Sequence, residues 1–180
     1  PMLLTWPAGC DGRRELAELV HFTDWLPTLL RVASLESPAH LALDGVDVLP
    51  LLRGERGGAP TTRFWQWNRY TPAAECNAAM RDGDWKLVRP AIRECMQLAP
   101  ADFAMDVDAK YRPERYSDIE RAPEPERAPF RAPPAQLFDL ARDPFESHDL
   151  AGAEPERVLR MERALGAWFE DVEQERRRIA

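Results

Sequence analysis

The stretch RDGDWKLV (81–88) restricts the fold more than any other part of this 180-residue sequence. Asp82-Gly83 lies between two short apolar segments, CNAAM and WKLV. A two-residue hairpin turn needs a positive φ, which glycine adopts without steric cost, so this pattern predicts a β-hairpin. Side chains alternate along a strand, and we therefore expect Trp85 and Leu87 to share one face of a sheet.

Two further runs favour strands, and the last segment favours a helix. The strands are expected in TTRFWQWNRY (61–70) and in LFDL (137–140), which a turn at Asp143-Pro144 follows. Residues 155–179 form an amphipathic pattern with apolar residues three or four positions apart. These segments predict an antiparallel sheet of three or four strands. We expect the apolar face of the helix to pack on this sheet, and binding of a partner protein by that face is the less favoured alternative. The stripe consists of Val158, Met161, Leu165, Trp168 and Val172.

The first third of the chain predicts a strand and a helix that belong to something larger. MLLTW (2–6) suits a buried strand, which needs neighbours that nothing nearby in sequence offers. HFTDWLPTLLRVASL predicts a helix that ends near Leu35, with Thr23 as N-cap and Asp24 in its first turn. Asp44-Gly45 is a turn signal before the apolar LPLL, and ERGGAP (55–60) reads as a flexible break.

Residues 91–134 have a composition different from the rest of the chain. The first half has some apolar content and predicts a helical turn. The second half is rich in Pro, Glu and Arg with little to bury, and favours an extended surface insertion. A proline-rich recognition motif is the alternative for this half.

Composition excludes some classes of partner. The net charge of −7 and the pI near 5.1 argue against nucleic acid or an anionic membrane, and no apolar run approaches a membrane span. Cys10, Cys76 and Cys95 are spaced too widely for a zinc knuckle or a C-x-x-C pair. This sparse, odd set favours reduced thiols and a cytoplasmic setting, with one disulfide left open; the compartment itself is not fixed.

The residues alone predict no catalytic or metal site. His21, His40 and His148 are the only imidazoles, and none follows a pattern that places it beside a nucleophile. Such histidines are more often structural or solvated than catalytic. The acidic pairs Asp44/Asp47 and Asp106/Asp108 are weak cation signals, for which solvated loops are the better interpretation.

Five segments in order resemble the C-terminal third of a sulfatase of the alkaline-phosphatase-like superfamily. They are PMLLTWPAG, TDWLPTLLRVASL, LDGVDVLPLLRG, RDGDWKLV and LFDLARDPFESHDLAG. The family typically reads P-hydrophobic-W-P-G, D-hydrophobic-P-T-L-L, D-G-x-S-L-x-P-L-L-x-G, G-x-W-K-L and L-Y-D-L-x-x-D-P-x-E-x-x-N-L. Asp47, Phe138 and Asp149 depart from it, where Ser, Tyr and Asn are common. The matches are Trp6-Pro7; Asp24 with Pro27 to Leu30; Asp44-Gly45 with Leu49 to Gly54; Gly83 with Trp85 to Leu87; and Leu137 to Leu140 with Asp143, Pro144 and Glu146.

The resemblance implies an α/β, alkaline-phosphatase-like fold. Residues 1–58 would be the end of the catalytic domain, with the last strand and helix of its large sheet. Residues 59–180 would be a C-terminal subdomain with a small antiparallel sheet, the insertion at about 91–134 and the terminal helix 155–179.

The resemblance also implies hydrolysis of sulfate esters with calcium and a formylglycine made from the Cys or Ser of a C/S-x-P-x-R motif. No cysteine or serine here begins that motif. The catalytic residues and metal ligands would therefore lie upstream, and this chain alone is expected to be inactive. Its partners would be the upstream catalytic domain of the same protein and a sulfate-ester substrate.

One loop, WNRYTPAAECNA (67–78), is expected to contribute to a substrate rim. Its polar residues Asn68, Arg69, Glu75 and Asn77 lie between aromatic strands, and Arg69 suits an anionic substrate. A structural role is the alternative for each residue. Two other functions stay open: a phosphonate or phosphate ester hydrolase of the same superfamily, and a freestanding, non-catalytic interaction module that binds through 112–134 or the C-terminal helix.

Overall fold

The computed structural model describes residues 2–10, 12–38, 40, 42–55, 59–116 and 124–179. The chain divides into two compact units, Pro1–Arg63 and Phe64–Ala180. Within the described ranges, no helix has both the length and the apolar character that crossing a membrane requires.

The first unit contains a 3₁₀ turn, η1 (Phe22–Asp24), and two helices, α1 (Trp25–Val32) and α2 (Leu49–Arg53). The predicted helix is present, but it is shorter than expected and ends three residues before Leu35. Thr23 as its N-cap is wrong. His21 caps the preceding 3₁₀ turn instead, because its ring accepts from the backbone N–H of Thr23 and Asp24 closes the reciprocal capping bond.

The carboxylate of Asp24 connects several segments of the first unit. This carboxylate is fully buried, accepts from the backbone N–H groups of His21 (2.8 Å) and Val46 (2.9 Å), and receives Arg63 Nη2 at 2.8 Å on both oxygens. The Asp44-Gly45 turn brings Val46 here, and only glycine fits, because a Cβ at Gly45 would lie 2.0 Å from a backbone oxygen. One buried ion pair with two backbone donors therefore joins helix, turn and the start of strand β1.

The buried strand expected at residues 2–6 is wrong for this chain. These residues have no regular structure, and Leu3 is 99% exposed. A strand forms only where another strand satisfies its backbone N–H and C=O groups. The described part of the first unit offers none beside this segment.

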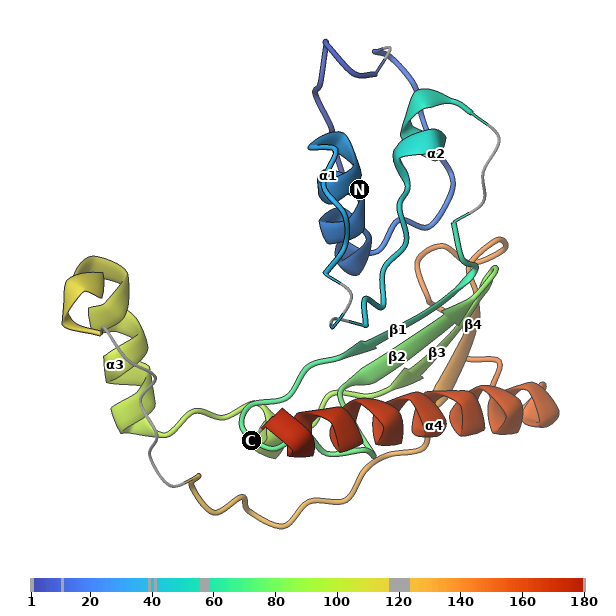
Figure 1. Cartoon of the computed structure of the whole chain (residues 1–180). Coiled ribbons are helices and arrows are strands. Elements are labelled where there is room, and N and C mark those ends of the chain that lie inside the picture. Colours follow the sequence, from blue (N-terminus) through green and yellow to red (C-terminus); the bar gives the residue numbers. More distant parts are fainter. Residues whose placement is uncertain are drawn as a thin grey trace. The chain divides into compact units, whose positions relative to one another are not determined.

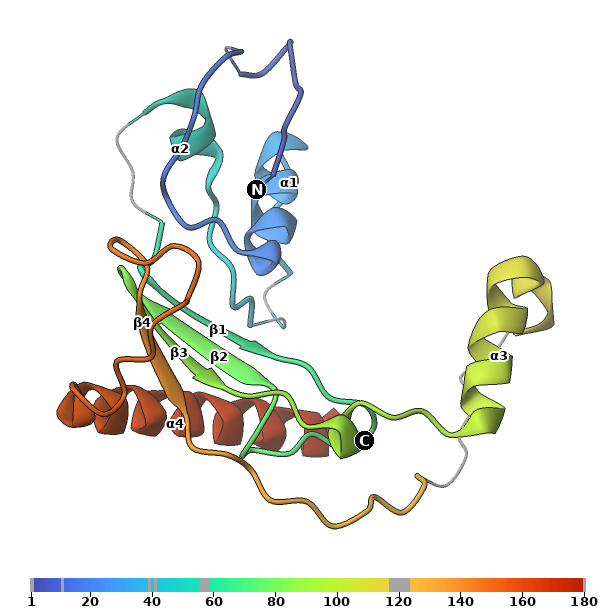
Figure 2. The ribbon, with the colours of Figure 1, turned by 180° about the vertical axis from the view of Figure 1, so that it is seen from behind.

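The second unit is a four-stranded sheet with a long helix along it. Strand order is β1-β2-β3-β4, and both the β2–β3 and the β3–β4 pairs are antiparallel. Helix α4 runs along one face of the sheet, as Figures 1 and 2 show from opposite sides. The antiparallel sheet and terminal helix predicted from the sequence are confirmed. The bounds are β1 Thr62–Gln66, β2 Ala78–Asp82, β3 Trp85–Arg89, β4 Gln136–Asp139 and α4 Pro155–Ile179.

The predicted hairpin joins β2 to β3, with its turn one residue later than expected. Asp82 pairs with Trp85, so Asp82 still belongs to the strand and the two loop residues are Gly83 and Asp84. Gly83 has φ = 59°, as the first central residue of a type II′ turn requires, whereas Asp84 has no positive φ. The correction has a physical reason: a II′ turn needs glycine first, so glycine sets the register.

We expect Gly83→Ala to destabilise the second unit by about 1–2 kcal/mol, because an L side chain at this φ meets its own backbone. No other atom lies within 4 Å of a Cβ built there, so the loss would report backbone strain alone. Urea unfolding followed by circular dichroism measures it. Asp84→Ala is the matched control, and equal stability of the two variants would contradict the assignment.

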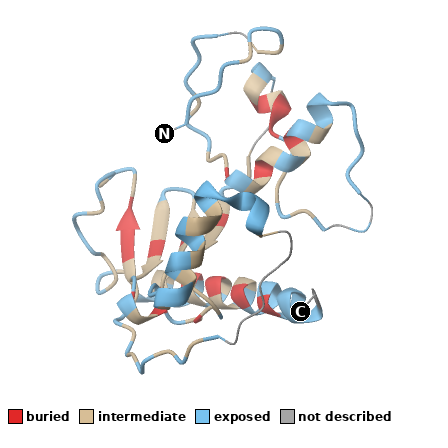
Figure 3. Ribbon diagram, turned by 90° about the vertical axis from the view of Figure 1, so that its left-hand side faces the viewer, coloured by how far each residue is buried: buried red, intermediate tan, exposed pale blue. Residues whose placement is uncertain are grey.

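The main core of the second unit lies between α4 and the sheet, where Figure 3 shows the buried segments of the strands and helix. Leu87 and Leu137 are opposite each other in the β3–β4 pair, and both are fully buried. Trp85 packs against the same cluster as Leu87, which confirms their predicted common face. From α4, Met161 and Leu165 complete this cluster, so the apolar stripe packs on the chain's own sheet as predicted.

The insertion contains more helix than expected. A 3₁₀ turn, η2 (Arg93–Cys95), precedes α3 (Pro100–Tyr111) and a second turn, η3 (Pro113–Arg115). Pro100 in the first turn and the Asp106–Lys110 and Asp108–Arg112 pairs four residues apart favour α3, which a search for apolar periodicity alone misses. Residues 124–134 lack regular structure, as predicted. Residues 117–123 and part of the break at 55–60 lie outside the described residues.

An ion pair near the C-terminal end of α4 predicts a pH dependence. Glu173 is 3% exposed, and Arg176 donates to both of its carboxylate oxygens. This hydrogen bonding holds the pKa of Glu173 below its usual value despite burial. The stabilisation is therefore complete above the ordinary glutamate pKa, about 4.3, and is lost as the pH falls through the lowered folded pKa. Glu173→Gln should lower Tm by a few degrees at neutral pH and by less in acid. The control Glu170→Gln, on the exposed side, should show no such difference.

Candidate functional site

The loop between β1 and β2, residues 67–77, carries the four predicted rim residues. Trp67 N–H donates to the Asn77 carbonyl (2.9 Å), which closes the loop at its base. Arg69 N–H donates to the Cys95 carbonyl (2.8 Å), and so ties the loop to the first turn of the insertion. Tyr70 and Asn77 both have positive φ (57° and 54°), so the chain turns sharply at two points. The loop is therefore a shaped element with several backbone ties.

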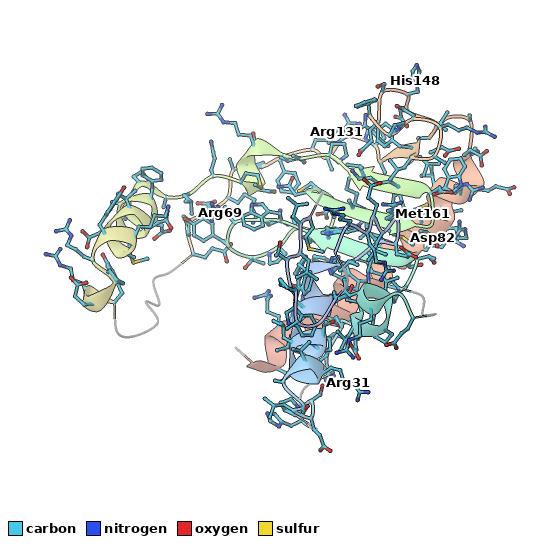
Figure 4. All side chains as sticks on the ribbon, turned by 90° about the horizontal axis from the view of Figure 1, so that it is seen from above. Arg31, Arg69, Asp82, Arg131, His148 and Met161 are labelled. Atoms are coloured by element: carbon cyan, nitrogen blue, oxygen red, sulfur yellow. The ribbon has the colours of Figure 1, made fainter. Side chains whose placement is uncertain are left out.

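Asn68 and Arg69 lie next to each other on this loop and are half-buried. The Asn68 side-chain oxygen accepts from Gln66 Nε2 at 2.7 Å, which fixes the orientation of its amide. The Arg69 guanidinium lies over the exposed Trp67 ring, 5.6 Å from the ring centroid. Among the described residues no carboxylate lies within salt-bridge distance of Arg69. Figure 4 labels Arg69 at the end of the sheet away from Asp82 and Met161. Arg69 therefore offers a cation to solvent, whereas the Asn68 amide is held within the protein, its Nδ2 lying 3.9 Å from Cys76 Sγ.

Asn77 and Glu75 are placed differently from that pair. The Asn77 side-chain oxygen accepts from Ile92 N–H at 2.6 Å, so its amide faces the protein and holds the insertion. Its buried Nδ2 has no hydrogen-bond partner among the described residues. Glu75 is exposed and lines a separate surface pocket of about 270 Å³, together with Arg89 and Glu162. The structure therefore brings Asn68 and Arg69 together, and gives Asn77 a structural contact.

Sequence reasoning missed the residues that hold this loop in place. The Tyr70 hydroxyl accepts a hydrogen bond from Ala99 N–H (2.8 Å), and this bond lowers the pKa of the hydroxyl. The hydroxyl also donates to the Asp102 carboxylate, and this donation together with burial raises the pKa above its ordinary value. Tyr70 therefore donates as a neutral hydroxyl and joins the loop to the first turn of α3. The only signal was an aromatic residue beside the polar pair, which is typical of strands as well.

The proline-rich part of the insertion also reaches back to the loop. The Glu124 carboxylate accepts hydrogen bonds from both the backbone N–H and the hydroxyl of Thr71. The bond from the hydroxyl is the largest cause of the lowered pKa of Glu124. Arg127 donates to the carbonyls of Arg69 (3.2 Å) and Thr71. Glu124 and Arg127, which belong to the part of the insertion predicted to be an extended surface segment, therefore hold the β1–β2 loop in place.

The imidazoles and acidic pairs do not assemble a second site. His21 is buried in the first unit, while His148 is exposed with Nδ1 3.5 Å from Asp143. Asp47 accepts from Leu49 N–H before α2, and Asp108 pairs with arginines at the end of α3. No group of three His, Cys, Asp or Glu that could hold a metal ion occurs in the described part of the chain. The β1–β2 loop carries one partly exposed cation, Arg69, whereas its thiol, Cys76, is buried and its exposed carboxylate, Glu75, lines the separate pocket.

Comparison with known proteins finds sulfatases among the relatives of this chain. Steryl-sulfatase of Mus musculus is 29% identical over 163 residues, which cover 86% of this chain and 23% of the relative. Arylsulfatase A of Bos taurus is 28% identical over 153 residues (83% and 25%), and the ulvan-active sulfatase of Formosa agariphila is 25% identical over 154 residues (84% and 28%). Most of this chain is related to sulfatases. The predicted resemblance is confirmed, and the chain spans about a quarter of the length of these relatives.

Other comparisons add little to the sulfatase relationship. No protein-family model matches the chain. A solved 2-O GAG sulfatase is 18% identical with a TM-score of 0.47, over 87% of this chain and 26% of that one. Another solved structure, in complex with D-glucosamine-2-N,6-O-disulfate, is 16% identical with a TM-score of 0.43, over 82% and 24%. TM-scores below 0.5 do not establish a shared fold.

Proposed function

We propose that this chain is the C-terminal part of a sulfatase, a sulfuric ester hydrolase of alkaline-phosphatase-like fold, with its catalytic residues upstream. The observation that carries the proposal is the relationship to sulfatases over 83–86% of the chain. The five family segments in their usual order support it. Residues 1–58 would then complete the catalytic domain and 59–180 would form the C-terminal subdomain.

The residues of this chain do not fit the two groups that sulfate-ester hydrolysis would require. The described part has no cluster of metal ligands for calcium. Cys76 and Cys95 are buried, and no cysteine or serine begins C/S-x-P-x-R, so the formylglycine has no precursor here. Calcium and formylglycine would both be held elsewhere in the complete protein, and this chain alone would be inactive.

We propose that helix α1 faces the upstream catalytic domain. Three apolar side chains on or beside this helix are largely exposed: Phe22 (68%), Leu26 (50%) and Leu29 (58%). Exposed apolar side chains in such a cluster mark a contact surface. The isolated chain should bind the dye 8-anilinonaphthalene-sulfonate, and the longer protein should bind it less. Equal dye binding by both would contradict this contact.

Arg69 would be the main contribution of this chain to substrate binding, with Asn68 beside it. A sulfate ester carries a negative charge, and Arg69 is partly exposed with no salt bridge among the described residues. A charge-assisted hydrogen bond contributes about 1.5–3 kcal/mol, so Arg69→Ala in the longer protein should raise KM about tenfold or more, with kcat changed less. Arg142→Ala, at an 89% exposed side chain, is the control. Unchanged KM in Arg69→Ala would remove this residue from the rim.

A direct assay tests the proposed function. The longest natural polypeptide that contains this chain and the 180-residue chain alone are each given an aryl sulfate, an aryl phosphate and an aryl phosphonate. We expect sulfate release from the longer polypeptide only. Hydrolysis of the phosphorus esters alone would favour the related phosphate or phosphonate ester hydrolase. A natural polypeptide of only 180 residues that folds without catalytic activity would favour a freestanding interaction module.

A further inference from the structure

Two thiols from different segments meet inside the second unit. Cys76 precedes β2 and Cys95 ends η2, 19 residues further along the chain. Their side chains are 0% and 1% exposed, and the two Sγ atoms are 3.4 Å apart, in contact. A disulfide requires the Sγ atoms to close to about 2 Å, which a small adjustment of the two side chains provides.

The backbone on both sides of the thiols holds this approach. Arg69 N–H donates to the carbonyl of Cys95 itself, at 2.8 Å. Asn77, the neighbour of Cys76, donates its N–H to the Pro90 carbonyl (3.1 Å) and accepts from Ile92 N–H at its side-chain oxygen (2.6 Å). Three hydrogen bonds thus align the two segments, so the contact follows from their backbone placement.

The surrounding core is small. Among the residues that the structure describes, the cluster has two buried members besides the cysteines, Ala73 and Ile92, with Phe130 and Ala132 packed against it. It contains none of the residues of the main core under α4. A cluster of this size buries little apolar surface, and a covalent link is a common means of stabilising such a region.

We infer that Cys76 and Cys95 form a disulfide that fastens the β1–β2 loop to the beginning of the insertion. The bond would hold the loop that carries Asn68 and Arg69, and it does not depend on the proposed sulfatase activity. The sequence left one disulfide open without indicating which pair.

The reaction consumes a small-molecule disulfide such as oxidised glutathione. One cysteine thiolate attacks it, releasing one glutathione thiolate and forming a mixed disulfide; the second cysteine thiolate then attacks the protein sulfur and releases the second. Two protein thiols are oxidised, one glutathione disulfide is reduced, and the two protons pass to the released thiolates or to solvent. Burial, with the hydrogen bond to Cys95, raises the pKa of Cys76 to about 12. The thiolate is therefore scarce in the folded chain, and the bond forms during folding or local opening.

The test uses the 180-residue chain in glutathione redox buffers, without denaturant and in urea. After acid quenching, free thiols are alkylated and the mass and linked peptides are determined. We expect a product two hydrogens lighter, one alkylated thiol at Cys10 and a Cys76–Cys95 peptide pair. The disulfide stabilises the folded chain by the same free energy by which folding favours the disulfide. The equilibrium constant for forming the disulfide should therefore be about 30-fold or more higher without urea than in urea.

Matched variants keep the test specific. Cys10→Ser should retain the link, because Cys10 lies in the other unit. Cys76→Ser should lose it and leave Cys95 free or bound to glutathione. Three alkylated thiols in the oxidising buffer, a link that includes Cys10, or equal linkage with and without urea would each overturn the inference.

Discussion

Replacement of Asp24 by alanine is expected to destabilise the first unit by about 3–5 kcal/mol, since it leaves the Arg63 guanidinium buried without its counter-charge. Asp24 is fully buried and Arg63 is 7% exposed, so water cannot replace the lost partner easily. The backbone N–H groups of His21 and Val46 would lose their acceptor as well. Asp24→Asn keeps the shape and one acceptor oxygen, and should cost less.

Hydrogen–deuterium exchange over the peptides of α1 and α2 measures this loss locally. Exchange should accelerate throughout both helices in Asp24→Ala. The control Arg31→Gln removes a pair whose arginine is 73% exposed and whose charged atoms are 4.0 Å apart, so it should change little. Equal exchange in Asp24→Ala and Arg31→Gln would show that the buried pair does not organise this unit.

The second large effect is expected from Leu165→Ala, at about 2–5 kcal/mol. Leu165 is fully buried between α4 and the sheet, where the shorter side chain would leave a cavity beside Leu87 and Leu137. Leu159 lies on the same helix and is 50% exposed, so Leu159→Ala is the matched control and should change stability by about 0.5 kcal/mol or less. Urea unfolding of the two variants, followed by circular dichroism, compares them. Similar midpoints for both would mean that α4 does not pack on the sheet as described.

Local patterns predicted the second unit well. The hairpin follows from one glycine, whose φ of 59° sets the turn, and α4 follows from an apolar stripe at helical spacing. Both signals act over a few residues. The turn position was wrong by one residue, because Gly83 could be the second loop residue of a I′ turn or the first loop residue of a II′ turn, and only the pairing of Asp82 with Trp85 distinguishes the two.

The contacts of the four loop residues could not be predicted from local sequence patterns. Asn68, Arg69, Glu75 and Asn77 were grouped because they share a polar loop. In the structure, a backbone N–H of the insertion binds the Asn77 side chain, while Arg69 stacks on Trp67. Composition cannot distinguish these outcomes, since the partners of each side chain come from elsewhere in the chain.

The sequence by itself determined the antiparallel hairpin, the terminal helix and the relationship to sulfatases, because turn conformation, apolar periodicity and motif order are properties of neighbouring residues. Only the tertiary structure decided which buried groups meet. Asp24 and Arg63 are 39 residues apart, and Cys76 and Cys95 are 19 apart. Such contacts depend on how whole segments are placed, and the same holds for residues 2–6, whose apolar pattern forms no strand where no partner strand lies beside it.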